Sequence, residues 1–188
     1  MTGAGLDDAF AAVHREDFLR PAERPFAHLD RPLPIGQGQT NSQPSTVRAM
    51  LGLLDVRPGQ RVLDVGAGSG WTTALLARLV GPGGRVVGTE LEPSLAAWGA
   101  GNLARYDMPW ATLEEARPGV LGRPDLAPYD RILVSAAARE LPAELVEQLS
   151  PGGRMVVPVG ATMLVVVRRP DGTAEVTRHG SYSFVPLR

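Results

Sequence analysis

The sequence predicts an α/β fold in which a mostly parallel, twisted sheet carries helices on both faces. Two observations lead to this prediction. Short apolar runs alternate with apolar patterns of helical spacing from residue 60 onward, and glycine or proline marks most of the boundaries between them. The last two apolar runs flank a Pro-Asp-Gly turn at 170–172, which indicates an antiparallel C-terminal hairpin. In such sheets the ligand lies beyond the carboxyl ends of the strands.

Before residue 60, two segments with helical apolar spacing flank a proline-rich stretch. Residues 7–19 place apolar side chains at helical spacing and predict a short helix. Residues 20–44 hold five prolines, too many for a regular element, and predict an irregular loop. A loop of this length in a compact domain is more often functional than idle. The helical pattern resumes over residues 44–54.

From residue 60 we expect five strands, three helices and the hairpin. The strands are expected at 61–65, 85–90, 110–116, 129–137 and 154–159, the helices at 71–81, 93–106 and 140–149, and the hairpin strands at 163–169 and 174–179.

Composition excludes several function classes. The 188 residues are 44% apolar and 21% charged, which is ordinary for a globular protein. With 19 basic and 20 acidic residues, no net positive charge favours nucleic acid, so we expect no nucleic-acid partner. The absence of cysteine excludes disulfides, thiolate metal sites and a cysteine nucleophile. The absence of lysine excludes Schiff-base chemistry, and three scattered histidines give no reason to expect a metal.

Neither a membrane span nor a targeting segment is recognisable. The longest apolar stretch, 155–167, falls short of the roughly 18 residues that a spanning helix needs. We therefore expect no membrane partner and a cytoplasmic location.

The sharpest local signal is a glycine loop between a strand and a helix. Asp64 lies in the strand, the run Gly66-Ala67-Gly68-Ser69-Gly70 follows, and Trp71 opens the helix. Glycines allow a ligand close to the backbone, where the amides of the helix start face it. Trp71 replaces the third glycine of a dinucleotide fingerprint. Glu90 ends the next strand, where a carboxylate can accept two ribose hydroxyls. The alternative is a tight turn with glycines for packing only.

Longer motifs surround this loop, among them RPLPIGQGQTNSQP at 31–44, V-x-R-x-x-F at 13–18, APYD at 127–130, LVSAAA at 133–138 and FVPL at 184–187. The glycine loop with its acidic partners resembles the first motif of the S-adenosylmethionine-dependent methyltransferases. Together the motifs resemble the protein-L-isoaspartate (D-aspartate) O-methyltransferase family along nearly the entire chain.

The resemblance implies a Rossmann-like class I methyltransferase that binds S-adenosyl-L-methionine. It implies esterification of the α-carboxylate of isoaspartyl residues in damaged proteins or peptides, by a monomer. Within one domain, 1–188, it implies an N-terminal helix and substrate loop (1–44), a cofactor-binding core (45–160) and a hairpin with a closing strand (161–188). The alternatives are a dedicated Asp carboxyl methyltransferase that forms aspartimide in one partner, and a cofactor-binding module with weak catalysis.

The resemblance also assigns site residues by position. It places Ser42 and Thr40 in the catalytic site, where Ser42 orients the substrate carboxylate. The implied cofactor-binding residues are Gln39, Asn41, Asp64, Gly66, Ala67, Gly68, Ser69, Gly70, Glu90, Leu91 and Gly119; the implied substrate-binding residues are Ile35, Val185, Pro186 and Leu187. From local sequence alone, Ser42 is instead the N-cap of the helix at 44–54.

One departure concerns the adenine side of the cofactor. The family carries a Gly-Asp-Gly run after the third strand, whereas this chain has Arg117-Pro118-Gly119. Glu115 and Asp125 are the acidic residues near enough in sequence to replace the missing aspartate.

Overall fold

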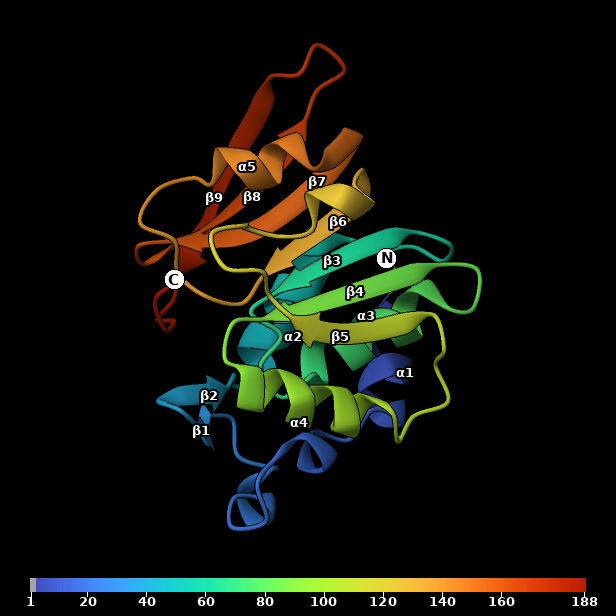
Figure 1. The fold of residues 1–188 in the computed structure, drawn as a ribbon, viewed down its shortest axis with the longest axis vertical. Coiled ribbons are helices and arrows are strands. Elements are labelled where there is room, and N and C mark those ends of the chain that lie inside the picture. Colours follow the sequence, from blue (N-terminus) through green and yellow to red (C-terminus); the bar gives the residue numbers. More distant parts are fainter. Residues whose placement is uncertain (1–2) are drawn as a thin grey trace.

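The computed structural model describes residues 3–188 and contains a seven-stranded sheet with strand order β5-β4-β3-β6-β7-β8-β9 (Figure 1). Neighbouring strands from β5 to β7 are parallel, whereas β8 and β9 are antiparallel. This arrangement confirms the predicted, mostly parallel sheet with a C-terminal hairpin. The strands are β3 (Arg61–Val65), β4 (Arg85–Glu90), β5 (Ala111–Glu115), β6 (Tyr129–Val134), β7 (Leu149–Val159), β8 (Thr162–Arg168) and β9 (Ala174–Ser181).

Apolar side chains cover both faces of the central strands. Val62 and Leu63 of β3 are both fully buried, yet they belong to different apolar clusters because successive side chains point to opposite faces. Ile132 and Leu133 of β6 divide in the same way. A parallel sheet buried on both faces needs this near-continuous apolar sequence.

The helices are α1 (Gly3–Ala12), α2 (Pro44–Leu54), α3 (Trp71–Val80), α4 (Pro93–Leu103) and α5 (Ala143–Glu147). Apolar residues of α1 to α4 form the cluster on one face of the sheet. On the other face, the short α5 and the segment 121–127 cover the second cluster. The prediction of helices on both faces is confirmed, with most of the helical cover on one side.

Several predicted elements have different ends. The helix predicted at 7–19 is α1 followed by a separate 3-10 turn, Arg15–Phe18, because His14 has extended backbone with φ −78° and ψ 124°. The helix predicted at 140–149 is only α5, since Pro142 occupies its N-cap position. The strand predicted at 129–137 ends at Val134.

The largest correction falls in residues 20–44, which the sequence predicts to be irregular. They contain a 3-10 turn (Arg24–Phe26) and an antiparallel pair, β1 (Leu33–Gly36) and β2 (Gln39–Asn41). Leu33 and Ile35 are buried while Pro34 is exposed, so the short strand alternates despite its proline. Proline is tolerated in β1 because the two-stranded ribbon consists of edge strands.

A third, small apolar cluster fixes this hairpin to α4. Leu33 and Ile35 pack with Leu95 in this cluster. Nearby, the Arg20 guanidinium lies 3.7 Å from the centre of the Trp98 ring, and its Nε donates to the Ile35 carbonyl at 3.0 Å. The hairpin therefore lies beside the carboxyl edge of the main sheet, at the lower left of Figure 1.

Candidate active site

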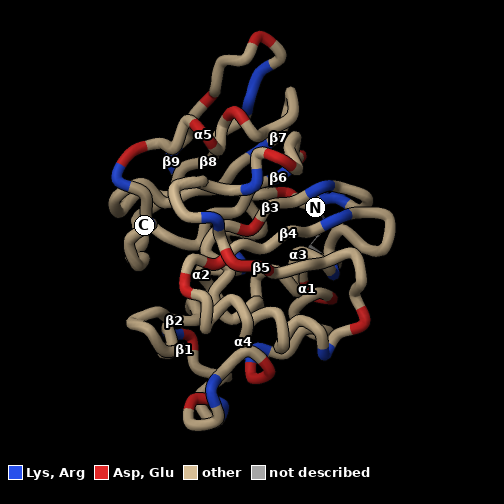
Figure 2. Tube along the Cα trace, viewed as in Figure 1, with Lys and Arg blue, Asp and Glu red and all other residues tan. Residues whose placement is uncertain are grey.

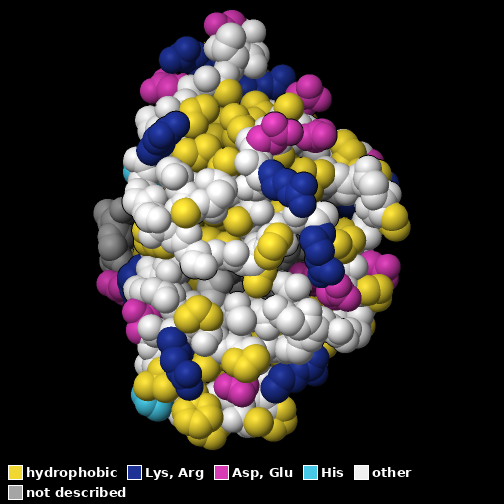
Figure 3. Space-filling model, turned by 90° about the vertical axis from the view of Figure 1, so that its left-hand side faces the viewer, with side chains coloured by type: hydrophobic (Ala, Val, Ile, Leu, Met, Phe, Trp, Pro, Cys, Tyr) yellow, Lys and Arg dark blue, Asp and Glu magenta, His cyan; other side chains and the backbone are white. Residues whose placement is uncertain are grey.

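A cavity of about 860 Å³ opens at the carboxyl edge of the sheet. The chain leaves β3 toward β4 on one side, whereas β6 lies on its other side, so this edge is a topological switch point. The parallel strands point toward the left of Figure 1, and Figure 3 views the molecule from that side. Hydrophobic side chains and scattered arginines share this surface, as expected for a ligand site with few polar anchors (Figure 3).

The glycine loop contributes two residues to the lining of the cavity. Gly66, Gly68 and Gly70 have φ values of 77°, 54° and 88°, a region that favours glycine. The N–H groups of Gly66 and Ala67 donate to the Thr89 carbonyl at 2.9 and 3.0 Å, which fixes the loop to the end of β4. The strand-to-helix turn predicted from the sequence is present, and Gly66 and Gly68 line the cavity.

Gly99 of α4 packs directly against this loop. A Cβ at position 99 would lie 2.6 Å from the Gly68 carbonyl oxygen and 2.9 Å from Leu113 Cδ1. A Cβ at Gly70 would in turn lie 2.9 Å from the Gly99 carbonyl oxygen. Gly99 therefore permits the close approach of α4 to the glycine loop. A conspicuous glycine within a helix was the available signal.

Glu90 joins the loop to the start of α4. Its side chain is buried, with Oε2 accepting from Gly68 N–H at 2.8 Å and Oε1 accepting from Glu92 N–H at 3.0 Å. Each carboxylate oxygen can accept a second hydrogen bond, so Glu90 remains able to hold two hydroxyl groups. Leu91 follows it and also lines the cavity.

Asp64 lies behind the loop and does not line the cavity. The Asp64 side chain is fully buried, and Oδ2 accepts from the hydroxyls of Thr72 and Thr73, both at 2.7 Å. Burial raises the pKa of Asp64 to about 6, against the lowering effect of these two hydrogen bonds, and the nearby Glu90 charge adds to the rise. Asp64 therefore anchors the start of α3 and supplies negative charge behind the loop.

Arg15 organises the segment that leads into the hairpin. Its buried guanidinium donates to Asn41 Oδ1 at 2.8 Å and to the carbonyls of Leu29, Arg31 and Ser42 at 2.9, 2.8 and 2.9 Å. Burial lowers the pKa of Arg15 to about 10, so the group stays charged at neutral pH. The arginine of the V-x-R-x-x-F motif thus binds both the segment 29–31 and the end of β2.

Asn41 carries this connection on to the glycine loop. Its Nδ2 donates to the Ser69 hydroxyl at 3.1 Å, and both side chains are buried. Asn102 of α4 donates to the Ser69 carbonyl at 3.0 Å. Asn41 and Ser69 therefore support the site from behind the cavity wall.

The two predicted catalytic residues differ in position. Thr40 lines the cavity beside Gln39, whereas Ser42 follows β2 and is not a lining residue. The N-cap of α2 is Gln43, not Ser42, and the Gln43 side chain makes no capping hydrogen bond. In the first turn, Ser45 N–H donates instead to Asp30 Oδ1 at 2.8 Å. The alternative role of Ser42 as an N-cap is therefore wrong.

Neither acidic residue near Pro118 faces the cavity. Asp125 accepts hydrogen bonds from Arg117 at 3.0 Å and from Arg123 at 2.9 Å, and these contacts lower its pKa. Glu115 is exposed, and it does not line the cavity either. Neither residue occupies the position of the missing aspartate; that wall consists of Ala116, Arg117 and the segment 119–122.

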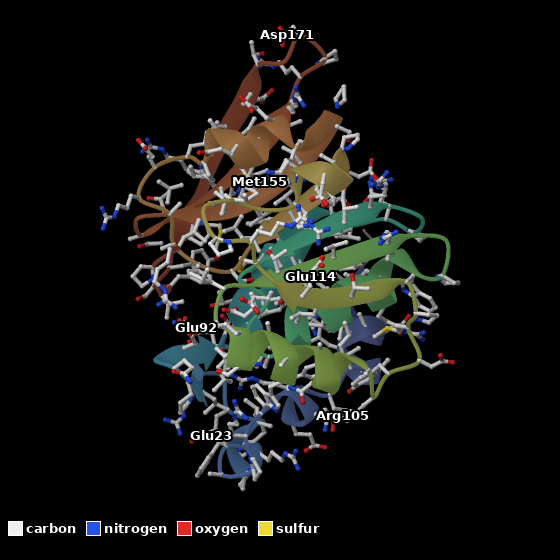
Figure 4. The ribbon with its side chains drawn as sticks, in the orientation of Figure 1. Glu23, Glu92, Arg105, Glu114, Met155 and Asp171 are labelled. Carbon is white, nitrogen blue, oxygen red and sulfur yellow. The ribbon has the colours of Figure 1, made fainter. Side chains whose placement is uncertain are left out.

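The C-terminal segment closes the opposite wall. Ala137 N–H donates to the Val185 carbonyl, and Leu187 N–H donates to the Ala137 carbonyl, both at 2.8 Å. Arg188 Nη2 then donates to Glu92 Oε1 at 2.6 Å, which connects this segment to α4. Glu92 is labelled in Figure 4 at the start of α4.

The structure thus separates the predicted site residues into two groups. Those that line the cavity are Ile35, Gln39, Thr40, Gly66, Gly68, Glu90, Leu91, Gly119, Val185, Pro186 and Leu187. Those that lie outside its lining are Asn41, Ser42, Asp64, Ala67, Ser69 and Gly70. Lining residues that sequence reasoning did not assign include Ser135 and the segment 138–144, where only a short family motif gave a signal.

The described residues contain neither a membrane-spanning helix nor a cluster of metal ligands. Within residues 3–188, no helix is long and apolar enough to span a bilayer. The same residues contain no group of three or more His, Cys, Asp or Glu side chains with the arrangement of a metal site.

Comparison with known proteins identifies the family. The family model for protein-L-isoaspartate(D-aspartate) O-methyltransferase matches residues 3–188. The protein-L-isoaspartate O-methyltransferase of Aeropyrum pernix is 48% identical over 191 residues, covering 100% of this chain and 74% of the relative. The protein of the same name from Methanopyrus kandleri is 45% identical over 184 residues, covering 96% of this chain and 81% of the relative.

Solved structures agree with this comparison. A protein-L-isoaspartate O-methyltransferase structure matches with a TM-score of 0.84 at 26% identity, covering 98% of this chain and 61% of that one. A Plasmodium falciparum structure in complex with S-adenosyl-L-homocysteine matches with a TM-score of 0.83 at 23% identity, covering 100% and 92% of the two chains, and supports the fold. The fold is that of the class I methyltransferases, and the chain belongs to the protein-L-isoaspartate O-methyltransferase family.

Proposed function

We propose that this chain transfers a methyl group from S-adenosyl-L-methionine to the α-carboxylate of isoaspartyl residues in damaged proteins or peptides. The observation that carries the proposal is one continuous cavity that contains the glycine loop and Glu90, the hairpin residue Thr40, and the C-terminal segment at Val185. Donor and acceptor sites must share one cavity for direct transfer. The names of the relatives support this substrate class.

The cofactor end of the cavity fits a nucleoside with a cationic centre. Glu90 offers acceptor capacity to ribose hydroxyls, with Leu91 beside it, while Gly66 and Gly68 allow close approach to the backbone. The carboxylates of Asp64 and Glu90 give this end negative charge. When bound, the cofactor supplies an electrophilic methyl group on a positively charged sulfur. Gly119 and its neighbours form the wall for the base, without a carboxylate at Pro118.

The acceptor end needs neither a metal nor a strong base. A carboxylate is already ionised at pH 7, so its oxygen can attack the methyl carbon directly, and no proton has to move. The chain's contribution is to align the carboxylate and exclude water. We assign orientation of the carboxylate to the hydroxyls of Thr40 and Ser42.

The remaining predicted residues support these two ends. Gln39 extends the lining beside Thr40, and Ile35 provides apolar contact on the hairpin side. We propose that Val185, Pro186 and Leu187 pair with substrate backbone. Asn41, Ala67, Ser69 and Gly70 hold the loop and hairpin in place from outside the lining.

The dedicated carboxyl methyltransferase of one partner is not favoured, because the relatives are named for isoaspartate. The basic and acidic residues are interspersed along the chain, which supports protein substrates over nucleic acid (Figure 2). We further propose that residues 1–188 act as a single cytoplasmic domain and as a monomer. Sedimentation at micromolar concentration tests the last point, and a stable dimer would contradict it.

Methyl transfer from radiolabelled S-adenosyl-L-methionine to a short isoaspartyl peptide tests the function. The matched control is the same peptide with normal aspartate. We expect base-labile label on the isoaspartyl peptide alone. Cofactor binding by calorimetry without label on either peptide would overturn the proposal and favour a weakly catalytic cofactor-binding module.

A further inference from the structure

Ser135 follows directly on β6, where the central strands meet the cavity. Its N–H donates to the Val65 carbonyl at 2.8 Å, and the residue lines the cavity. A Cβ at Gly66 would lie 3.8 Å from the Ser135 carbonyl carbon. Ser135 is therefore held against the first glycine of the loop.

The Ser135 hydroxyl oxygen is buried and has no hydrogen-bond partner within residues 3–188. An unpaired buried hydroxyl costs free energy, and such groups in native proteins call for an explanation. Rotation about one Cα–Cβ bond moves a serine hydroxyl between three staggered positions, so it can meet a bound group without backbone movement. At the wall of a ligand cavity, a bound group is the natural partner.

The strand order indicates whether the Ser135 hydroxyl meets the cofactor or the methyl acceptor. β4, β3 and β6 are consecutive neighbours, and their carboxyl ends carry Glu90, the glycine loop and Ser135 in that order. Neighbouring strands lie about 4.8 Å apart, so Ser135 is roughly 10 Å from the end of β4. If Glu90 holds the ribose and the loop faces the sulfur, Ser135 lies on the far side of the sulfur, where the acceptor enters.

The hydrogen bonds of Ala137 also place Ser135 near the acceptor side of the cavity. Ala137, two residues after Ser135, exchanges hydrogen bonds with Val185 and Leu187. These residues belong to the segment that we assign to the substrate backbone. Ser135 thus lies between the glycine loop and the substrate segment.

We propose that the Ser135 hydroxyl donates a hydrogen bond to the carboxylate that receives the methyl group, an inference that rests on the proposed function. The proton stays on Ser135. One carboxylate oxygen accepts this hydrogen bond, which orients the other oxygen toward the methyl carbon. Ser135 is then a substrate-binding residue, and it acts neither as nucleophile nor as base.

The test compares Ser135→Ala with Ser181→Ala, a control at an exposed serine of β9. Peptide binding is measured by calorimetry on protein loaded with S-adenosyl-L-homocysteine. We expect Ser135→Ala to weaken binding of an isoaspartyl peptide about 10- to 100-fold, as for a hydrogen bond to a charged group. It should leave the affinity for the same peptide with an α-carboxamide nearly unchanged. Ser181→Ala should change neither.

Stability supplies a readout that separates binding from structure. Because the hydroxyl has no partner within residues 3–188, Ser135→Ala should unfold at the same or a higher urea concentration than wild type. A clear loss of stability would show a structural role and overturn the proposal. Two other results would also overturn it. One is unchanged affinity for the isoaspartyl peptide with a free α-carboxylate, and the other is a loss of affinity for S-adenosyl-L-homocysteine in place of the peptide.

Methyl-transfer kinetics distinguish failure of the Ser135 assignment from failure of the proposed function. Wild-type methyl transfer to the isoaspartyl peptide, with unchanged kinetics in Ser135→Ala, would overturn only the Ser135 assignment. Absence of transfer by the wild type would overturn both.

Discussion

Arg15 Nε donates to Asn41 Oδ1 at 2.8 Å, across 26 residues of sequence, and Asn41 in turn donates to the Ser69 hydroxyl. One buried guanidinium therefore connects the N-terminal segment, the hairpin and the glycine loop. The substrate side and the cofactor side of the cavity are held in a fixed relation by this connection. Their geometry depends on a residue that touches neither ligand in the proposed arrangement.

Arg15→Lys should disturb both folding and peptide binding. A lysine ammonium cannot reproduce the fork of guanidinium hydrogen bonds, so several partly buried carbonyls lose their donors. We expect the free energy of unfolding to fall by about 2–4 kcal/mol, measured by urea denaturation. The KM for an isoaspartyl peptide should rise.

Arg78→Lys, at an exposed position of α3, is the matched control and should change neither quantity. Equal stability of the two variants would show that the Arg15 network contributes little.

Gly99→Ala and Gly101→Ala form a second matched pair within α4. A Cβ at position 99 would meet the Gly68 carbonyl at 2.6 Å, whereas a Cβ at position 101 has no neighbour within 4 Å. Gly99→Ala should push α4 away from the glycine loop and weaken cofactor binding at least tenfold in calorimetry. Gly101→Ala should stabilise the protein by about 0.5–1 kcal/mol, as alanine does in a helix. Similar behaviour of both variants would contradict the close-packing argument.

The repeating part of the fold could be predicted from the sequence because each element carries its own pattern. The strand at 61–65, the glycine turn and the helix from Trp71 are local, so apolar runs and glycine spacing determine them. The hairpin at 33–41 could not be predicted in this way, since its stability comes from packing on Leu95 and Trp98, far away in sequence.

In the site, too, features set by local sequence could be predicted, whereas features set by contacts distant in sequence could not. Glu90 was predictable because its strand ends where the neighbouring glycine loop begins. The roles of Arg15 and Gly99 depend on contacts across 26 and 31 residues, for which the sequence offers no spacing rule. Nearness in sequence made Glu115 and Asp125 candidates to replace the missing aspartate, but neither lines the cavity, and Asp125 is instead bound by Arg117 and Arg123.

Asp64→Asn should make stability depend less on pH. Burial raises the pKa of Asp64 from 3.8 to about 6, so the folded protein holds this proton more tightly than the unfolded chain. Between these values the folded state binds more protons, and the contribution of Asp64 to stability falls as pH rises. Above pH 6 the ionised carboxylate is therefore destabilising.

The Asp64→Asn variant should accordingly be more stable than wild type by about 1–3 kcal/mol at pH 8 and nearly equal to it at pH 4. Urea denaturation at both pH values measures the difference. A loss of stability at pH 8 would show that the hydrogen bonds from Thr72 and Thr73 require the charge.

Ser42→Ala tests the proposed orienting role of this hydroxyl. Because Ser42 does not cap α2, its removal should leave thermal stability within about 0.5 kcal/mol of wild type. We expect kcat/KM for an isoaspartyl peptide to fall about 10- to 100-fold through loss of a hydrogen bond to a carboxylate. Full retention of kcat/KM would remove Ser42 from the catalytic assignment.

Glu90→Gln tests the cofactor end. The Glu90 side chain accepts from Gly68 N–H and Glu92 N–H, and the glutamine oxygen can keep one of these contacts while its NH2 group faces the other donor. The variant also loses the negative charge beside a cationic ligand and one acceptor for the ribose. Calorimetric affinity for S-adenosyl-L-methionine should fall about 10- to 100-fold, since each lost charge-assisted hydrogen bond contributes about 1.5–3 kcal/mol. Glu115→Gln, at an exposed position on β5, should bind S-adenosyl-L-methionine with wild-type affinity.

The two forms of the cofactor separate the role of charge from that of the ribose. Because a sulfonium is cationic and the sulfur of S-adenosyl-L-homocysteine is neutral, Glu90→Gln should lower the affinity for S-adenosyl-L-methionine more than the affinity for S-adenosyl-L-homocysteine. Equal losses for both ligands would assign Glu90 to the ribose alone, and no loss for either would exclude it from the cofactor site.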